Sequence, residues 1–191
     1  ADGKLLGTWS RNENRVFVDY DSIAPVMFDA LTATEDVRFY DHSGIDAKAL
    51  ARAVVKRGIF GQKGAGGGST ITQQLAKQLY SSTAATTMQR LLQKPIEWVI
   101  AVELERAYTK EEILTLYLNY FDFLHNAVGI KTAAKVYFGK QPRDLTTLEA
   151  ATLVGMCNNP SYFNPVRDPE RCRPRPNRRV QKRRQAEQPH E

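Results

Sequence analysis

The sequence has few of the residues on which disulfide-held and zinc-held proteins depend. Its 191 residues include two cysteines, Cys157 and Cys172, and three histidines spread from His42 to His190. Two cysteines are too few for a disulfide framework, although a single Cys157–Cys172 bridge stays open as an alternative. Histidines so far apart in the chain do not indicate a zinc site. The length is sufficient for one domain with a hydrophobic core, or for two small lobes that share a cleft.

Long hydrophobic runs are also absent. No run approaches the roughly 18 apolar residues that a membrane-spanning helix needs, and the first residues lack the basic and apolar regions of a signal peptide. The start, Ala1–Lys4, reads like the interior of a longer chain, so we expect any anchoring segment to lie outside this sequence. Hydrophobic residues make up 42% and charged residues 25%, which is ordinary for a globular protein.

Acidic residues are missing from one segment near the end. Residues 1–170 contain equal numbers of basic and acidic side chains, whereas Arg171–Arg184 has eight basic residues and no acid. Such a run is first of all a solvated tail; attraction to anionic lipid head groups is the next interpretation, and nucleic acid a distant third. No aromatic residue interrupts the run to stack on bases, so we expect no nucleic-acid partner.

The hydrophobic pattern predicts a mainly α protein with a short β element near its start. A β-like run, Arg15–Val18, precedes apolar residues at helical spacing from Ser22 up to Glu35. Further helices are expected over residues 46–57, 69–79, 97–106, 113–118 and 150–156, with loops at 58–68 and 81–87. Thr109–Glu112 and Thr146–Glu149 have the form of capping boxes before the last two of these helices.

Two acidic residues follow the first predicted helix. In a helix that runs through this segment, Glu35, Phe39 and His42 share one face, because they are spaced i, i+4 and i+7. A carboxylate beside an aromatic ring is partly desolvated, which suits it to proton transfer. Asp36 would project about 100° away and act as a structural partner. Taken alone, the pattern fits a surface Glu-Asp pair on an amphipathic helix better than a catalytic site.

A glycine-rich run leads into a predicted helix start at Ser69 and Thr70. Exposed backbone N–H groups and the positive end of the helix dipole make such a start a natural phosphate site, and Lys77 lies further along the same helix. The spacing is not that of a Walker loop. A flexible linker before a capped helix explains the pattern equally well.

A third segment, Lys94-Pro95-Ile96-Glu97, is expected at the head of a helix. Proline suits the first helical turn, which would place Glu97 near the positive end of the dipole, where a carboxylate is stabilised. An ordinary acidic residue at a helix start is the simpler alternative.

Together these segments resemble the family 51 glycosyltransferases, the peptidoglycan glycosyltransferase domain of class A penicillin-binding proteins and of monofunctional transglycosylases. The resemblance covers roughly residues 3 to 171 and rests on five motifs in order. The motifs are Glu35-Asp36-x-x-Phe39-x-x-His42-x-Gly44, Gly67–Gln74 with Lys77, Lys94-x-x-Glu97, Lys110–Asn119, and Gly129–Lys140 with Asn164-Pro165.

The resemblance implies a lysozyme-like, bilobal α fold and an enzyme that polymerises lipid II into β-1,4 glycan strands with inversion, releasing undecaprenyl pyrophosphate. Residues 21–170 would form the domain, with about 45–90 as the smaller, membrane-facing lobe and active-site loop. Residues 1–20 would be an extended linker, and 171–191 a basic tail, disordered or cut short. No Ser-x-x-Lys occurs, so a transpeptidase site is not expected in this sequence.

The resemblance also implies roles for individual residues. Glu35 would be the general base that deprotonates the 4-hydroxyl of the acceptor sugar. Glu97 would be the second catalytic carboxylate, orienting Lys94 or holding a divalent cation, Mg²⁺ or Mn²⁺, at the pyrophosphate; no organic cofactor is expected. The remaining substrate-binding residues would be Asp36, Phe39, His42, Gly68, Ser69, Thr70, Gln73, Gln74, Lys77, Lys94 and Asn119.

By the same resemblance, the enzyme would work on the extracytoplasmic face of the bacterial cytoplasmic membrane, anchored by a helix outside this sequence. Its partners would be lipid II, the growing glycan strand, the membrane surface and other proteins of cell-wall synthesis. A basic helix face, Lys48, Arg52 and Lys56, would lie near anionic head groups. Two other functions stay open: a lipid II-binding module without catalysis and, less favoured, a lysozyme-like glycan hydrolase.

Overall fold

A computed structural model describes residues 15–58, 68–80, 87–160, 162–167 and 169, and this part of the chain is mainly helical. The predicted α class is confirmed. The described helices are α1 (Pro25–Glu35), α2 (Ala47–Gly58), α3 (Ile71–Tyr80), α4 (Thr87–Ala107), α5 (Lys110–Tyr120), α6 (Ile130–Phe138) and α7 (Thr147–Asn158), with 3-10 turns η1 (Tyr20–Ser22), η2 (Phe39–Asp41) and η3 (Pro142–Asp144).

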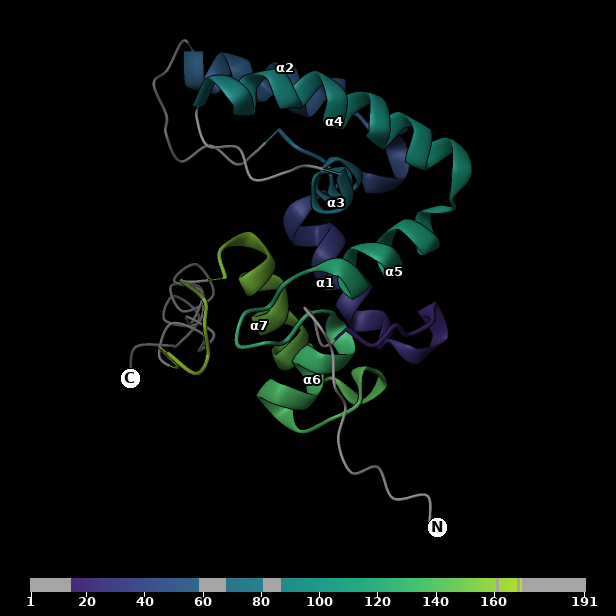
Figure 1. The fold of residues 1–191 in the computed structure, drawn as a ribbon, viewed down its shortest axis with the longest axis vertical. Coiled ribbons are helices and arrows are strands. Elements are labelled where there is room, and N and C mark those ends of the chain that lie inside the picture. The colour runs from purple at the N-terminus through teal and green to yellow at the C-terminus, as the bar shows by residue number, and fades with distance from the viewer. Residues whose placement is uncertain (1–14, 59–67, 81–86, 161, 168, 170–191) are drawn as a thin grey trace, which may run out of the picture.

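The helices are distributed along the long axis of the molecule. Figure 1 shows α2 and α4 at one end, α6 and α7 at the other, and α3 and α5 between them. Helix α3 packs against both α4 and α5, and α1 packs against α7. This arrangement agrees with a lysozyme-like α fold. The predicted lobe of residues 45–90 includes two stretches, 59–67 and 81–86, that lie outside the described residues, as do the predicted tail and most of the predicted linker.

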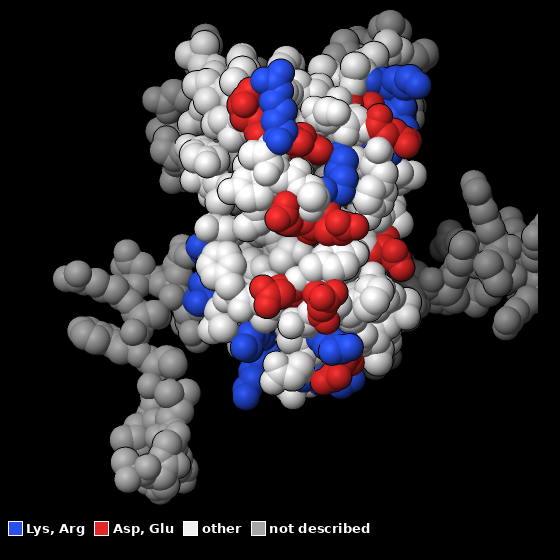
Figure 2. Space-filling view, turned by 90° about the vertical axis from the view of Figure 1, so that its right-hand side faces the viewer, with Lys and Arg blue, Asp and Glu red and all other residues white. Residues whose placement is uncertain are grey.

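One hydrophobic core joins these helices. Helix α1 buries Met27, Phe28 and Leu31. Helix α7 buries Ala150, Leu153, Val154 and Cys157, so each helix presents apolar residues three to four positions apart to its neighbour. Figure 2 shows a face of the molecule on which described basic and acidic side chains are interspersed rather than gathered by sign. None of the described helices is both long enough and apolar enough to span a bilayer.

The two predicted capping boxes are confirmed. The N–H of Glu112 donates to Thr109 Oγ1 at 3.2 Å, and the N–H of Thr109 donates to Glu112 Oε2 at 2.7 Å. Thr146 and Glu149 make the same reciprocal pair at the start of α7. There the N–H of Thr146 and the ammonium of Lys140 hold the pKa of Glu149 below its usual value. Both helices therefore begin directly after the predicted caps, at Lys110 and Thr147, three residues before the expected starts at 113 and 150.

The β element expected at Arg15–Val18 is wrong, because this segment forms no strand. Its backbone pairs with a side chain instead. The N–H of Val18 donates to Asn119 Oδ1 at 3.0 Å, and Asn119 Nδ2 donates to the carbonyl of Val18 at 2.9 Å. One amide side chain on α5 thus satisfies both backbone groups that a neighbouring strand would have satisfied.

The predicted start of the next helix, at Pro95, is also wrong. Helix α4 begins at Thr87, and Pro95 lies inside it. A proline within a helix removes one backbone hydrogen bond, but α4 packs along α3, and this packing supports a continuous helix. Glu97 is consequently in the third turn of α4. The dipole at the helix start cannot stabilise its charge, and another positive group must do so.

Candidate active site

Helix α1 ends at Glu35 because the next residue turns away from it. Asp36 has φ −154° and ψ 77°, outside the helical region, although its N–H still donates to the carbonyl of Thr32. Its Oδ2 accepts the N–H of Ile71 at 3.1 Å and the Nε2–H of His42 at 3.0 Å. The helix face predicted to carry Glu35, Phe39 and His42 is therefore wrong: tertiary hydrogen bonds to Asp36 break the helix between them.

Phe39 and His42 lie inside the protein. The Phe39 ring is fully buried, and the Lys110 ammonium stands 4.3 Å from its centroid. Lys110 Nζ also donates to the carbonyl of His42 at 2.6 Å and forms an ion pair with Glu105 at 2.7 Å. Both ring side chains are thus held between α5 and Asp36, in positions that support the end of α1.

The start of α3, predicted as a phosphate cradle, is capped by groups of the protein itself. Asp36 takes the N–H of Ile71, and Thr70 Oγ1 accepts the N–H of Gln73 at 3.1 Å. The Thr70 hydroxyl donates to the carbonyl of Gly44 at 2.6 Å. Gly44 has φ +89°, and a Cβ there would stand 2.7 Å from the carbonyl oxygen of Ala101, so this close approach needs glycine.

Glu35 is half-buried and bound by two amides from distant helices. Its Oε1 accepts from Asn158 Nδ2 at 3.1 Å, and its Oε2 accepts from Gln74 Nε2 at 3.1 Å. Asn158 is the last residue of α7 and Gln74 belongs to α3. Both donors are neutral, so they orient the carboxylate without neutralising its charge. An ionised carboxylate offers about four lone-pair sites, which leaves acceptor capacity on both oxygens.

Glu35 opens onto a cavity of about 320 Å³. Gly68, Ser69 and Thr70 line it from the start of α3, and a Cβ on Gly68 would stand 3.1 Å from that of Ala53 on α2. The other lining residues are Thr34, Asp36, Val37, Arg38, Asp46, Ala49 and Arg52. We call this space the Glu35 cleft. Its lining brings the first and second sequence motifs together, as their resemblance to one site implies.

The second carboxylate, Glu97, is 4% exposed and pairs with an ammonium. Lys94 Nζ stands 2.7 Å from Glu97 Oε2 and 3.4 Å from the hydroxyl oxygen of Ser69. Ser69 therefore contacts Lys94 while lining the Glu35 cleft. This is the geometry expected if Glu97 orients Lys94, and Lys94 itself is 43% exposed and accessible to a ligand.

Three predicted site residues lie away from the cleft. Gln73 is buried in α3, and Lys77 is exposed on the same helix. Asn119 is buried, and its amide bonds to Val18 and to the carbonyl of Thr115. None of the three lines the Glu35 cleft.

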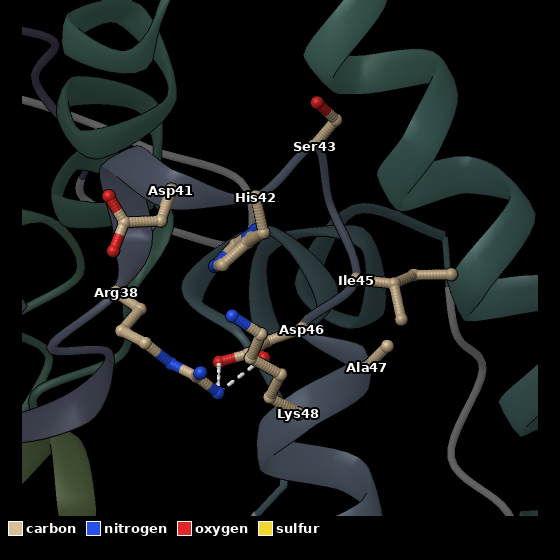
Figure 3. Close-up of a pocket in the computed structure, with 8 residues that line it drawn as sticks. All are labelled: Arg38, Asp41, His42, Ser43, Ile45, Asp46, Ala47 and Lys48. Atoms are coloured by element: carbon tan, nitrogen blue, oxygen red, sulfur yellow. Dashed lines mark hydrogen bonds and ion pairs between the residues drawn. The ribbon is translucent and has the colours of Figure 1, made fainter.

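Sequence reasoning missed an ion pair at the wall of the cleft. Arg38 and Asp46 line both the Glu35 cleft and a neighbouring cavity of about 340 Å³, which Figure 3 shows with the guanidinium reaching both oxygens of Asp46. Burial opposes the charge on Asp46, but the N–H of Ala49 and the Arg38 guanidinium outweigh it and lower the pKa of Asp46. The pair fixes the start of α2 beside the cleft. Arg38 and Asp46 are eight residues apart in the chain, and this spacing does not indicate an ion pair.

The described residues include no group of three or more His, Cys, Asp and Glu side chains arranged to hold a metal ion. Glu97 already faces the ammonium of Lys94. Cys157 is a free, buried thiol in the structure, so the alternative of a bridge to Cys172, which lies outside the described residues, is not supported.

Comparison with known proteins identifies the family of this chain. Residues 2–184 match the model of a family described as Transglycosylase. Penicillin-binding protein 1F of Bacillus subtilis (strain 168) is 42% identical over 163 residues, which is 85% of this chain and 22% of that protein. Penicillin-binding protein 1A of Neisseria lactamica is 40% identical over 173 residues (91% of this chain, 21% of that protein). Penicillin-binding protein 1A of Escherichia coli (strain K12) is 40% identical over 172 residues (90% and 20%).

The chain spans about a fifth of the length of these curated relatives. The family model, in contrast, covers nearly the whole sequence, from residue 2 to residue 184. The chain belongs to the transglycosylase family and is a glycosyltransferase.

Proposed function

We propose that this chain polymerises lipid II into peptidoglycan glycan strands. The observation that carries the proposal is the position of Glu35. Its carboxylate is oriented by neutral amides, keeps acceptor capacity, and lines the same cleft as Ser69, which contacts the Lys94–Glu97 pair. A base and a positive group for a leaving pyrophosphate therefore adjoin one cavity.

In the proposed reaction, Glu35 accepts the proton of the 4-hydroxyl on the acceptor's N-acetylglucosamine. The freed oxygen forms a bond to C1 of the lipid-linked sugar at the end of the donor strand. The bond from C1 to the pyrophosphate oxygen breaks, and its electron pair leaves with undecaprenyl pyrophosphate. Attack from the face opposite the leaving group inverts C1, from an α-linked donor to a β-1,4 product.

A pyrophosphate leaving group needs positive charge rather than an acid. Lys94 supplies it at the edge of the cleft, and Glu97 holds Lys94 in place. Arg52 lines the cleft and adds a second cation. A divalent cation fits this donor set only if phosphate oxygens of the substrate complete its coordination, as is usual for Mg²⁺. Glu97 would be the protein ligand. The ion would neutralise charge on the departing pyrophosphate.

Two other functions make different products from the same substrate. Labelled lipid II, incubated with the protein and Mg²⁺ or Mn²⁺, separates them, and a chelator in a parallel sample tests the cation. We expect polymer, visible as a ladder after separation by size. Retention of intact lipid II without turnover would indicate a binding module. Preformed glycan cut to shorter chains would indicate a hydrolase. Either result would overturn the proposal.

We also propose that the chain works at the extracytoplasmic face of the bacterial cytoplasmic membrane, held there by a segment outside this sequence. A lipid-linked substrate requires the cleft to lie close to the bilayer surface. Lys48 and Arg52 are exposed on α2, beside the cleft, where they can approach anionic head groups. The side chain of Lys56, the third residue of this predicted basic face, lies outside the described residues. Other proteins of cell-wall synthesis remain proposed partners.

A further inference from the structure

We propose that Tyr117 and Gln74 are positioning residues for Glu35, through a chain of hydrogen bonds that starts at the buried hydroxyl of Tyr117. The proposal rests on the proposed function, in which Glu35 is the base. It gives Gln74 a role different from the substrate contact that the sequence predicts, because both ends of its amide are engaged inside the protein.

The chain of contacts crosses three helices. Tyr117 on α5 places its hydroxyl oxygen 3.0 Å from Gln74 Oε1 on α3. Gln74 Nε2 then stands 3.1 Å from Glu35 Oε2 at the end of α1. The buried thiol of Cys157 on α7 is a further neighbour of the Tyr117 hydroxyl. The Tyr117 side chain is fully buried, so its hydroxyl has little access to water.

The chemistry of these groups fixes the direction of every bond. A carboxylate that acts as a base is ionised and only accepts hydrogen bonds, so the NH₂ end of Gln74 must face Glu35. The carbonyl end of the amide then faces Tyr117, which must donate. The single proton of the Tyr117 hydroxyl is thereby used for Gln74. Only this arrangement satisfies Glu35, Gln74 and Tyr117 together.

The surroundings of Tyr117 keep this arrangement constant with pH. Burial first, and then the neighbouring Cys157 and Glu35, raise the pKa of Tyr117 far above its usual value. Burial likewise raises the pKa of the Cys157 thiol. Both groups therefore remain protonated donors over the range in which an enzyme works, and neither can reverse the orientation of the Gln74 amide.

These hydrogen bonds affect the orientation of the Glu35 carboxylate rather than the affinity for the substrate. With Gln74 on one oxygen and Asn158 on the other, the plane of the Glu35 carboxylate is defined by two donors. Loss of the Tyr117 hydroxyl frees the Gln74 amide to turn and leaves Glu35 held from one side. Because a small misplacement of a base slows proton transfer while substrate contacts persist, kcat should fall with little change in KM.

A double-mutant cycle on lipid II polymerisation tests this. We expect Tyr117→Phe to lower kcat about tenfold with KM changed less than about twofold, and Gln74→Met to lower kcat by about tenfold or more. In the double variant, Tyr117→Phe should add nothing to Gln74→Met, because the hydroxyl acts only through the amide. Effects that multiply, or an effect of Tyr117→Phe on KM alone, would refute the chain of hydrogen bonds.

Two further variants guard against a general loss of structure. Tyr137→Phe removes the hydroxyl of a different, partly buried tyrosine, which donates to the carbonyl of Phe123, and should leave kcat unchanged. Asn158→Ala alters an exposed residue at the end of α7, so it should fold even if Tyr117→Phe does not. It should lower kcat several-fold at constant KM; an unchanged kcat would contradict the two-donor arrangement.

A measurement independent of activity separates this proposal from the proposed function. Hydrogen exchange of the Gln74 side-chain amide, followed by ¹⁵N NMR in the full chain, should be slowed in the wild type and faster in Tyr117→Phe, but not in Tyr137→Phe. Unchanged exchange in Tyr117→Phe would refute the positioning role even if the wild type polymerises lipid II. Faster exchange would support it even if the wild type makes no polymer.

Discussion

The two carboxylates of the candidate site, Glu35 in the cleft and Glu97 behind Lys94, stand in opposite electrostatic surroundings. Glu35 is half-buried and receives its two hydrogen bonds from neutral amides. Glu97 is almost fully buried and pairs with the ammonium of Lys94. A neutral donor leaves the negative charge available to a proton, whereas an ammonium at 2.7 Å neutralises it. Carboxylates with such different partners are suited to different tasks in one reaction.

The difference teaches which of the two can move a proton and which can hold a cation. Glu35 keeps acceptor capacity and faces the cavity. Glu97 acts through Lys94, which is the exposed member of the pair. Substitutions that keep the shape of each side chain while removing its charge should therefore give losses of different size and kind.

Glu35→Gln should have the largest effect. Removing a general base costs up to about 10⁴-fold in rate, so we expect polymerisation of labelled lipid II to be abolished while binding of lipid II to the protein is largely kept. Glu103→Gln, at an exposed carboxylate paired with Arg106 on α4, is the matched control and should polymerise normally. Polymer made by Glu35→Gln would show that another residue is the base.

Lys94→Met should come next. Loss of a positive group beside a developing anion costs about 10²-fold in kcat, and Glu97→Gln should cost less, because Lys94 remains. If Glu97 acts through Lys94, the double variant should be no slower than Lys94→Met alone. A double variant that is much slower would mean that Glu97 acts on the substrate or on a cation directly.

Asp46→Asn should affect stability more than rate, because Asp46 lies at the cleft wall but serves structure. The folded-state pKa of Asp46 is lowered from its ordinary value of 3.8. Its contribution is therefore complete above about pH 4 and is lost as the pH falls through the lowered value. Urea unfolding should show Asp46→Asn less stable than wild type by about 1 to 2 kcal/mol at pH 7, with a smaller difference near pH 3. An equal difference at both pH values would contradict this assignment; Asp144→Asn, at an exposed aspartate, is the control.

Charge reversal of Lys48, Arg52 and Lys56 together should have the smallest effect. Each basic residue near an anionic surface contributes about 1 kcal/mol, so binding to liposomes that contain anionic lipid should weaken, and binding to neutral liposomes should not. Unchanged binding to anionic liposomes would remove this face from the membrane proposal. Since Arg52 lines the cleft, Lys48→Glu alone separates membrane attraction from effects on the site.

The elements that the sequence predicts well have signals confined to a few neighbouring residues. The capping boxes at Thr109 and Thr146 are examples, since the cap and its partner lie three residues apart. The mainly α class follows from helical periodicity in the same way. The proximity of the first and second motifs at the cleft was expected from their family resemblance rather than from periodicity.

The features that the sequence did not predict depend on contacts between segments that are distant in the chain. The end of α1 is set by Asp36 bonding to Ile71, 35 residues away, and the second donor to Glu35 is Asn158, 123 residues away. Pro95 is a helix-start signal locally, but packing on α3 extends α4 past it. The segment Arg15–Val18, expected to form a strand, pairs instead with the side chain of Asn119, about 100 residues further along the chain. Contacts between residues so far apart in the sequence leave no local signal.

Asp36 has a mechanical consequence as well. It follows Glu35 directly and is bonded to the first N–H of α3, the helix that also carries Gln74 and begins beside Ser69. A displacement of α3 must therefore carry the base with it. If α3 moves relative to α7 when a glycan strand enters or leaves, Glu35 stays beside the start of α3, and the hydrogen bond from Asn158 has to form again.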